Sequence, residues 1–399
     1  MFSFLIRLMA SSVLGVTAAA LIWYGVCAQR VEMKDTQFMQ AHSGTSLFPS
    51  AVNLQGRRAK YQDLELKQAA AFFTSALRAS PVLISAWVEM AKVAEYTGQP
   101  SLAHFIQKML RNSLAEVTTW KWQELLLAYD INNDQFFADT LNFVFQRLPG
   151  RTMDACFVAA QYWGEWADIA QRLDQENLPR FIGHCMRTRH TRAALDAWSR
   201  LPHPDQELTI RFSHYLLHRK DIPTAVSVWE KVKGSSKHSI YNPGFEHKPL
   251  NRAFGWRLRR HEQVTVERDV FAQKEGRFAL HLKFRGTQNV KFHHVYQIVP
   301  VVPGRSYTLQ YFQKSDGLTT DQGAYLEVKG YRCQGLRAKG PMLTGSTAEW
   351  EEANVQLKVP EKCRAVLIRV RRDESLMLDN KISGHYWLDQ VVLTSVPVQ

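Results

Sequence analysis

The hydrophobic periodicity of this 399-residue chain changes once, near Lys237, and this change constrains the fold more than any other feature. Over 51–237 apolar residues recur at helical spacing, whereas later they form short runs separated by turn residues. The change coincides with Asn242-Pro243-Gly244, which predicts a turn because Pro fixes φ and Gly permits positive φ. We therefore predict an all-α domain over 51–237 and an all-β domain over 238–399.

The start of the chain predicts a membrane span. Leu8–Ala28 is a run of 21 residues without a charged side chain. As a helix it reaches about 31 Å, and the hydrocarbon core of a bilayer is about 30 Å thick. Arg7 precedes the run, which by the positive-inside rule keeps the N-terminus in the cytoplasm. We predict a signal anchor over 1–30 in the inner (cytoplasmic) membrane, a linker over 31–50, and the bulk of the chain on the periplasmic or extracytoplasmic side.

A cleaved signal peptide is the alternative for this segment. Val26-Cys27-Ala28 fits a small-x-small cleavage site. The bulky residues before it favour a retained anchor.

Charge is unevenly distributed. The chain carries a net charge of +13, of which +8 falls on 238–399 and only +3 on 31–237. Such an excess serves solubility or attracts an anionic partner. Nucleic acid is not the expected partner, because the chain is predicted to be exported.

The cysteines leave two states open. Cys156 and Cys185 lie in the helical part, and Cys333 and Cys363 lie in the β part. One disulfide in each domain is possible in an oxidising compartment, and four free buried thiols are equally compatible with the sequence. The spacing of the cysteines does not fit a zinc site.

The helical part repeats itself at a spacing of 34 residues. Ala69 and Ala103 are one such pair, and Pro81, Ala115 and Pro149 follow the same step. The pattern resembles the tetratricopeptide repeat, in which small and large residues interlock two helices per unit. The resemblance implies a helical-hairpin solenoid whose function is to bind a protein partner.

The β part contains eight apolar runs bounded by turn residues. They predict an antiparallel jelly-roll sandwich. The expected strands are Val264–Glu267, Phe278–Phe284, Val290–Val299, Tyr307–Lys314, Tyr325–Tyr331, Trp350–Val359, Ala365–Arg371 and Tyr386–Thr394.

A series of short motifs runs through these strands. In order they are Asn242–Glu246, Gly255-Trp256, Gly276-x-Phe278-Ala279-Leu280, Tyr296-Gln297, Pro303-Gly304-x2-Tyr307, Thr347-x2-Trp350 and Trp387-x-Asp389-x-Val391. The series resembles bacterial carbohydrate-binding modules of the galactose-binding-like jelly-roll type, over nearly all of 241–396. The resemblance implies that Trp256, Tyr307 and Trp350 are core aromatics.

The same resemblance implies a structural calcium ion that joins the first and last strands. Its candidate ligands are Glu246, Asp389 and a backbone carbonyl near Gly276. Two carboxylates supply only part of the six to eight oxygens that calcium needs. The alternative is that both carboxylates accept hydrogen bonds from neighbouring turns.

Strand alternation supplies the candidate glycan-binding residues. Side chains that point away from the predicted core include aromatic rings, which can stack on sugars, and several cations. The candidates are Phe312, Tyr325, Glu327, Lys329, Tyr331, Arg369 and Arg371. Such a face suits an anionic polysaccharide, and it is also what a solvated basic face looks like.

Together these features predict a non-catalytic, membrane-anchored envelope protein. Its repeats would bind a protein partner and its jelly roll a glycan, in polysaccharide assembly or export. The alternative is a pure protein–protein scaffold whose jelly roll no longer binds sugar. A polysaccharide-modifying enzyme is a third reading, which would need a pair of carboxyl groups in a cleft.

Overall fold

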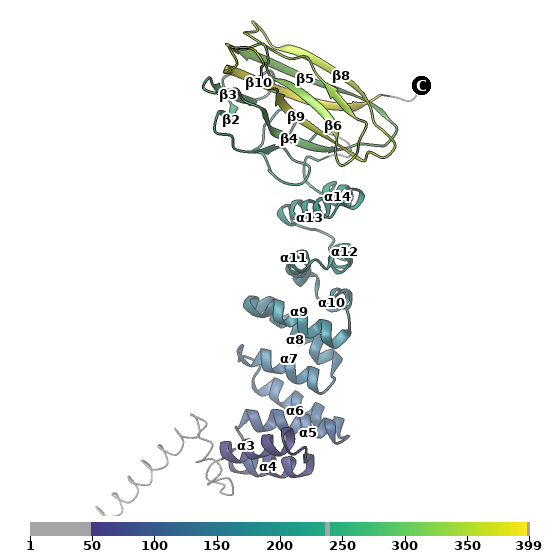
Figure 1. Cartoon of the computed structure of the whole chain (residues 1–399). Coiled ribbons are helices and arrows are strands. Elements are labelled where there is room, and N and C mark those ends of the chain that lie inside the picture. The colour runs from purple at the N-terminus through teal and green to yellow at the C-terminus, as the bar shows by residue number, and fades with distance from the viewer. Residues whose placement is uncertain (1–48, 236–239, 397–399) are drawn as a thin grey trace, which may run out of the picture. The chain divides into compact units, whose positions relative to one another are not determined.

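The computed structural model describes residues 49–235 and 240–396. Within these residues twelve α-helices precede ten β-strands (Figure 1). The helices are α3 (Pro49–Tyr61), α4 (Leu66–Ala79), α5 (Ile84–Tyr96), α6 (Pro100–Ser113), α7 (Trp120–Asp130), α8 (Asp134–Arg147), α9 (Thr152–Trp163), α10 (Trp166–Arg172), α11 (Leu178–Thr188), α12 (Thr191–Ser199), α13 (Gln206–His218) and α14 (Ile222–Trp229). The predicted order, helices followed by strands, is confirmed.

The predicted transmembrane helix and the inner-membrane location are corrected. Across 49–235 and 240–396 no helix is long and apolar enough to cross a bilayer. The longest of these helices have 14 residues, about 21 Å, well short of the roughly 30 Å hydrocarbon core. The run Leu8–Ala28, on which the prediction rested, lies outside the described residues. A membrane span is therefore not part of the fold described here.

The chain forms two compact units that divide between Arg200 and Leu201. In the first unit, helices adjacent in sequence pack as pairs, such as α3 with α4 and α5 with α6. Ala69 and Ala103, which are one 34-residue step apart, are both fully buried. Their small side chains let neighbouring helices pack closely. Helix pairs are thus confirmed, and their identity as tetratricopeptide units stays a prediction.

The second unit contains α13, α14 and two antiparallel five-stranded sheets. Sheet A has the order β1-β4-β9-β6-β7, and sheet B has the order β2-β3-β10-β5-β8. The strands are β1 (Arg257–Leu258), β2 (Val264–Asp269), β3 (Ala279–Arg285), β4 (Phe292–Pro300), β5 (Ser306–Asp316), β6 (Tyr325–Gly330), β7 (Arg337–Lys339), β8 (Glu351–Lys358), β9 (Ala365–Arg372) and β10 (Ser383–Ser395).

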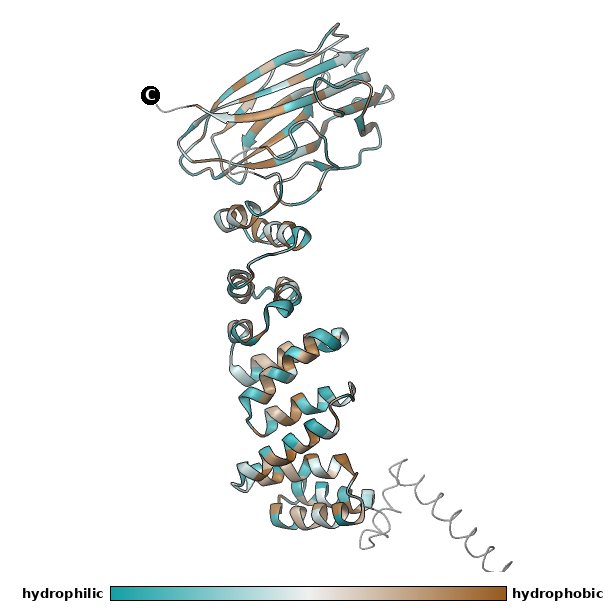
Figure 2. Ribbon diagram, turned by 180° about the vertical axis from the view of Figure 1, so that it is seen from behind, coloured by the Kyte–Doolittle hydropathy of each residue, from teal (hydrophilic) through white to brown (hydrophobic). Residues whose placement is uncertain are grey.

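The sandwich core consists of the alternate side chains of both sheets. Along β5, Tyr307, Leu309 and Tyr311 are buried, and apolar and polar residues alternate along the strands in Figure 2. Trp256 and Tyr307 are buried core aromatics, as predicted. Trp350 is only half-buried and lies just before β8, so its assignment to the core is wrong.

The helix pair α13–α14 packs against the chain segment that leads into the sheets. Trp229, only 2% exposed, makes edge contacts with Tyr241 and Phe254 at ring-centroid distances of 5.3 and 5.8 Å. His214 Nδ1 accepts a hydrogen bond of 3.1 Å from the backbone N–H of Ala253. These contacts explain why the second unit begins at Leu201, although the strands begin only at Arg257.

The β part contains a disulfide and the helical part does not. Cys333 and Cys363 are bridged, with their Cα atoms 5.4 Å apart. Cys156 and Cys185 are free and buried. Burial raises the pKa of Cys185 to about 12, so this thiol stays protonated at neutral pH.

Candidate functional site

The outer face of sheet A brings most of the predicted glycan-binding residues together. Tyr325 lies opposite Arg371, and Glu327 lies opposite Arg369, in the register of β6 with β9. Lys329 shares this face, because it is two residues after Glu327 on the same strand. Alternation along two separate stretches of sequence therefore identified neighbours in space.

Glu327 is the electrostatic centre of this face. Its side chain is fully buried, and Oε1 accepts a hydrogen bond of 2.7 Å from Arg337 Nε. Oε2 pairs with Arg369 at 2.5 Å and with Arg371 at 3.8 Å. Burial alone would raise the pKa of Glu327, but the hydrogen bonds from Arg369 and Arg337 outweigh burial and lower it. Glu327 is therefore a carboxylate that positions cations.

A second carboxylate, Asp373, orders the neighbouring part of the face. Arg371 donates to Asp373 Oδ1 from Nε and Nη2, at 2.9 and 2.6 Å. The Tyr325 hydroxyl donates to Asp373 Oδ2 at 2.6 Å. Burial opposes ionisation here, but the hydrogen bonds from Arg371 and Tyr325 outweigh it and lower the pKa of Asp373 to about 2. Tyr325 is only 3% exposed, so its ring is packed and not open to a ligand.

Tyr296 and the cations beside it were not predicted as binding residues. Tyr296 lies on β4, opposite Arg369 on one side and Arg257 on the other. The guanidinium carbons of Arg257 and Arg259 lie 5.7 and 5.4 Å from the centre of its ring. An irregularity between Phe292 and Val295 interrupts the alternation of β4, which hides this signal in the sequence.

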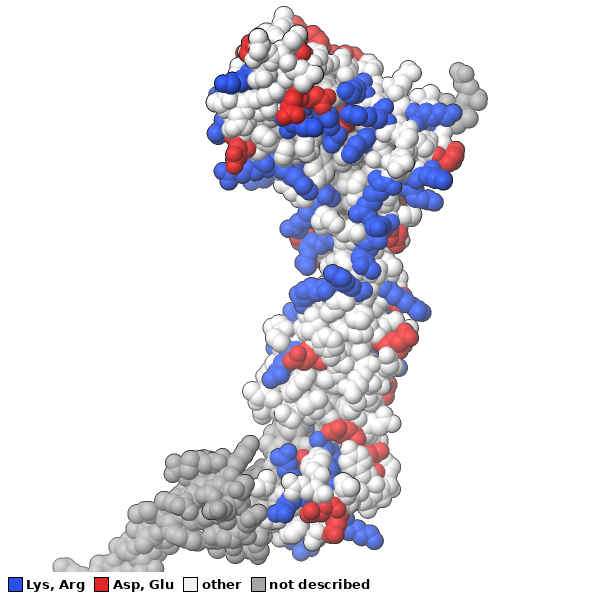
Figure 3. All heavy atoms as spheres, viewed as in Figure 1, with Lys and Arg blue, Asp and Glu red and all other residues white. Residues whose placement is uncertain are grey.

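This face carries a clear excess of positive charge. Seven basic side chains face two carboxylates: Arg257, Arg259, Lys329, Arg337, Lys339, Arg369 and Arg371 against Glu327 and Asp373. In the part of the chain that the structure describes, Arg257, Arg259 and Lys329 have no carboxylate partner. Lys and Arg side chains also outnumber Asp and Glu on the visible β-sandwich surface in Figure 3. The positive field is felt by His293, whose pKa is lowered by burial and then by Arg369 and Arg371.

Two predicted residues do not belong with this group. Phe312 lies on β5, which belongs to sheet B, and Lys274 Nζ lies 4.8 Å from the centre of its ring. Tyr331 follows the end of β6, and the guanidinium carbon of Arg332 lies 5.4 Å from its ring centre. Phe312 is therefore separated from the sheet A face, and Tyr331 is at its margin.

The predicted calcium ligands do meet at one corner of the sandwich. Glu246 Oε1 accepts backbone N–H bonds from Arg277 and Phe278, at 2.9 and 3.2 Å. A Cβ at Gly276 would overlap the Glu246 carboxylate, so the glycine allows this approach. Asp389 Oδ2 accepts backbone N–H bonds from Lys274 and Glu275, at 2.9 and 3.2 Å.

The oxygens at this corner already have protein partners. Arg268 Nη1 donates to the carbonyls of Phe245 and Glu246, at 3.2 and 2.9 Å. Within 49–235 and 240–396 no group of three His, Cys, Asp or Glu side chains is placed to hold a metal. The donor set is short of the six to eight oxygens that calcium takes. Calcium at this corner stays a prediction.

Comparisons with known proteins give similarity to solved structures only. No protein-family model matches, and no curated protein matches. The structure of TmCBM61 in complex with beta-1,4-galactotriose is 16% identical, with a TM-score of 0.29, and the match covers 41% of this chain and 100% of that one. The C-terminal family 22 carbohydrate-binding module of Clostridium thermocellum Xyn10B is 11% identical, with a TM-score of 0.30. That match covers 42% of this chain and 100% of the module's chain.

A third solved structure is the CBM22-1 xylan-binding domain from Paenibacillus barcinonensis Xyn10C. It is 14% identical, with a TM-score of 0.27, and the match covers 41% of this chain and 100% of that one. The three matches concern the C-terminal β region. At these TM-scores and identities they assign no ligand to this chain.

Proposed function

We propose that the β-sandwich is a non-catalytic module that binds an anionic polysaccharide on the outer face of sheet A. The observation that carries this proposal is the row of side chains that crosses the sheet from Arg257 through Tyr296 and Arg369 to Glu327 and Lys339. Tyr296 supplies a ring for stacking on a sugar. Arg257 and Arg259 beside it, which have no carboxylate partner among the described residues, supply charged donors for carboxylate or sulfate groups.

The arrangement of this row suits recognition of an extended chain. Arg369 is held by the buried Glu327 and is only 12% exposed, so it is positioned in advance. Arg337 and Lys339 on the edge strand are 56% and 53% exposed and can reach out to a ligand. A centre whose side chains are already held in place loses less conformational freedom when a ligand binds.

Within this proposal the helical repeats bind a protein partner, and the whole chain serves polysaccharide assembly or export. The support for the repeats is that α6 exposes Leu102 and Phe105, 41% and 65% of whose surfaces are accessible. Exposed apolar side chains close together on one helix are typical of a contact surface.

Direct binding measurements test the glycan proposal. We expect the full chain to bind polygalacturonate or alginate in isothermal titration calorimetry, with affinity that falls as salt rises, and to ignore neutral xylan. Tyr296→Ala and Arg257→Ala should each weaken binding about tenfold. Lys358→Ala on β8 of sheet B is the matched control and should bind like the wild type. Equal binding by all four proteins, or preference for the neutral glycan, would refute the proposal.

A pure scaffold remains the second candidate, and one observation favours it. Tyr325, an aromatic residue of the same charged face, is 3% exposed and already bonded to Asp373. If no acidic or neutral glycan binds while the folded chain is intact, the scaffold reading replaces the glycan-binding one.

A further inference from the structure

The irregularity in β4 sets two histidines, His293 and His294, opposite a single residue of β9, Arg371. The residues on either side of this pair, Phe292 and Val295, are buried in the core. His293 is exposed and His294 is half-buried. Both histidines therefore belong to the outer face of sheet A, beside the row of side chains that carries the proposed function.

A third imidazole adjoins this pair. The ring centres of His293 and His294 are 4.7 Å apart, and His261, between β1 and β2, lies 4.7 Å from His294. His261 Nδ1 accepts the backbone N–H of Gln263 at 3.1 Å, so this nitrogen is already used. Two protonated imidazoles at such a separation repel each other. The pair on β4 therefore takes up one proton more readily than two.

Cations act on the two histidines from the elements packed against β4. They are Arg369 and Arg371 of β9, Arg259 after β1, Lys291 before β4, and His261 once it is protonated. Burial, and then Arg369, lower the pKa of His293. Burial, and then His261, lower the pKa of His294. Both rings are therefore neutral at about pH 7, although they lie on a face that attracts anions.

The carboxylates of this face are already engaged. Asp373 pairs with Arg371 at 2.6 Å, and the buried Glu327 pairs with Arg369 and Arg371. Glu262, between β1 and β2, is exposed. A bound anion beside Arg371 adds a negative charge next to the two imidazoles, and an opposite charge at short distance favours the protonated form of a histidine.

We propose that the binding of an anionic glycan to the outer face of sheet A is coupled to the protonation of His293 and His294. The inference rests on the proposed function and adds its regulation by pH. In the free chain the two rings are neutral, and in the complex they take up a proton and donate to a carboxylate or sulfate of the glycan. Affinity therefore rises as pH falls through the window between the pKa in the complex and the lower pKa in the free chain.

Calorimetry of the full chain with polygalacturonate tests this coupling. The carboxyl groups of the probe titrate near pH 4, so its charge is constant between about pH 7.5 and about pH 5.5. We expect Kd of the wild type to fall about tenfold over this range, which corresponds to an average uptake of about half a proton. The heat of binding should differ between MES and bis-Tris, whose ionisation enthalpies are unlike, and this difference measures the uptake directly.

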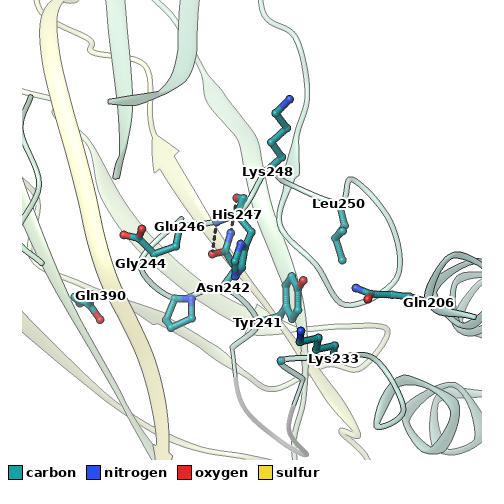
Figure 4. Close-up of a pocket in the computed structure, with 12 residues that line it drawn as sticks. Gln206, Lys233, Tyr241, Asn242, Gly244, Glu246, His247, Lys248, Leu250 and Gln390 are labelled. Carbon is teal, nitrogen blue, oxygen red and sulfur yellow. Dashed lines mark hydrogen bonds between the residues drawn. The ribbon is translucent and has the colours of Figure 1, made fainter. Parts of the chain in front are cut away.

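The double variant His293→Gln/His294→Gln removes the two imidazoles, so its Kd should change by less than about twofold over the same range. His247→Gln is the matched control. Figure 4 shows His247 on the turn beside a cavity that α13 also lines, and its backbone makes the bonds with Asn242 drawn there. This variant removes an exposed imidazole away from sheet A and should keep the pH dependence of the wild type. Thermal melting at both pH values checks that each variant is folded.

The outcomes separate the coupling from the proposed function. If the wild type binds with the same Kd at both pH values and the same heat in both buffers, the proposed function stands and the coupling is wrong. If the double variant keeps the pH dependence of the wild type, other groups take up the proton and the inference is wrong. If the wild type binds no glycan at either pH, both proposals fail.

A measurement on the wild type alone provides an independent decision. The ring protons of histidines can be titrated by NMR with and without tri-galacturonate. The pKa of His293 should rise when this probe is bound. An unchanged pKa in the complex refutes the coupling, whatever the variants do.

Discussion

Neutralising Glu327 should destabilise the second unit strongly. The Glu327→Gln substitution keeps the size of the side chain but removes the charge that holds Arg337, Arg369 and Arg371. Two of these arginines would still be solvated or paired. Arg337 is 56% exposed and can hydrogen-bond to water, and Arg371 keeps its ion pair with Asp373. Arg369, 12% exposed, is left without a carboxylate partner.

The loss of stability follows from Arg369, the one cation that is left buried without a carboxylate partner. Breaking a buried ion pair by removing one partner costs about 3–5 kcal/mol. Because Arg337 can be hydrated and Arg371 keeps Asp373, we expect a loss at the lower end, about 3 kcal/mol. For a unit of this size each kcal/mol lowers Tm by about 2–4 °C, so Tm should fall by about 6–12 °C. Thermal melting by circular dichroism measures this, with Glu351→Gln at an exposed position of β8 as the control.

The pH dependence provides an independent check. Because the pKa of Glu327 is lowered in the folded chain, its stabilising effect is complete above its ordinary value of 4.5. The effect is lost as pH falls through the folded value. The difference in Tm between wild type and Glu327→Gln should therefore be constant near pH 7 and shrink below pH 4.5. A Tm change under about 2 °C at pH 7, or a difference that grows in acid, would refute the reasoning.

Three further predictions concern the second unit. Replacing Cys333 and Cys363 by Ser should destabilise it by about 3–4 kcal/mol in urea unfolding, from the entropy of a 30-residue loop; an unchanged midpoint would show the bridge does not form. The fragment 201–399 should melt several degrees above 238–399, because the shorter one lacks the helix pair α13–α14; equal melting would favour an independent β domain. If calcium binds at Asp389, a hundredfold excess over Kd adds about 2.7 kcal/mol to the free energy of unfolding. A chelator or the Asp389→Asn substitution should remove that gain. If melting responds to neither calcium nor chelator, hydrogen bonds alone hold this corner of the sandwich. Burial, and then Glu246, raise the pKa of Asp389, so its ionisation costs stability as pH rises above 3.8.

The sequence by itself determined the order of the elements and the faces of several strands. Helical and strand periodicities are local properties, so the change near Lys237 separated helices from strands without any tertiary information. Alternation placed Tyr325, Glu327 and Lys329 on one side of their strand for the same reason. Glu246 and Asp389 met at one corner as the resemblance to carbohydrate-binding modules implied. The membrane span predicted over 1–30 did not stand, and neither did the core position expected for Trp350.

Only the tertiary structure decided which strands are neighbours, because pairing joins residues far apart in sequence. It placed Phe312 in sheet B, away from Glu327, and it set Tyr296 beside Arg257 across an irregular strand. Burial is decided the same way: Tyr325 alternates as an outward residue, yet its neighbours cover it and Asp373 holds its hydroxyl. Alternation gives the direction of a side chain along one strand, whereas its exposure depends on what other parts of the chain place above it.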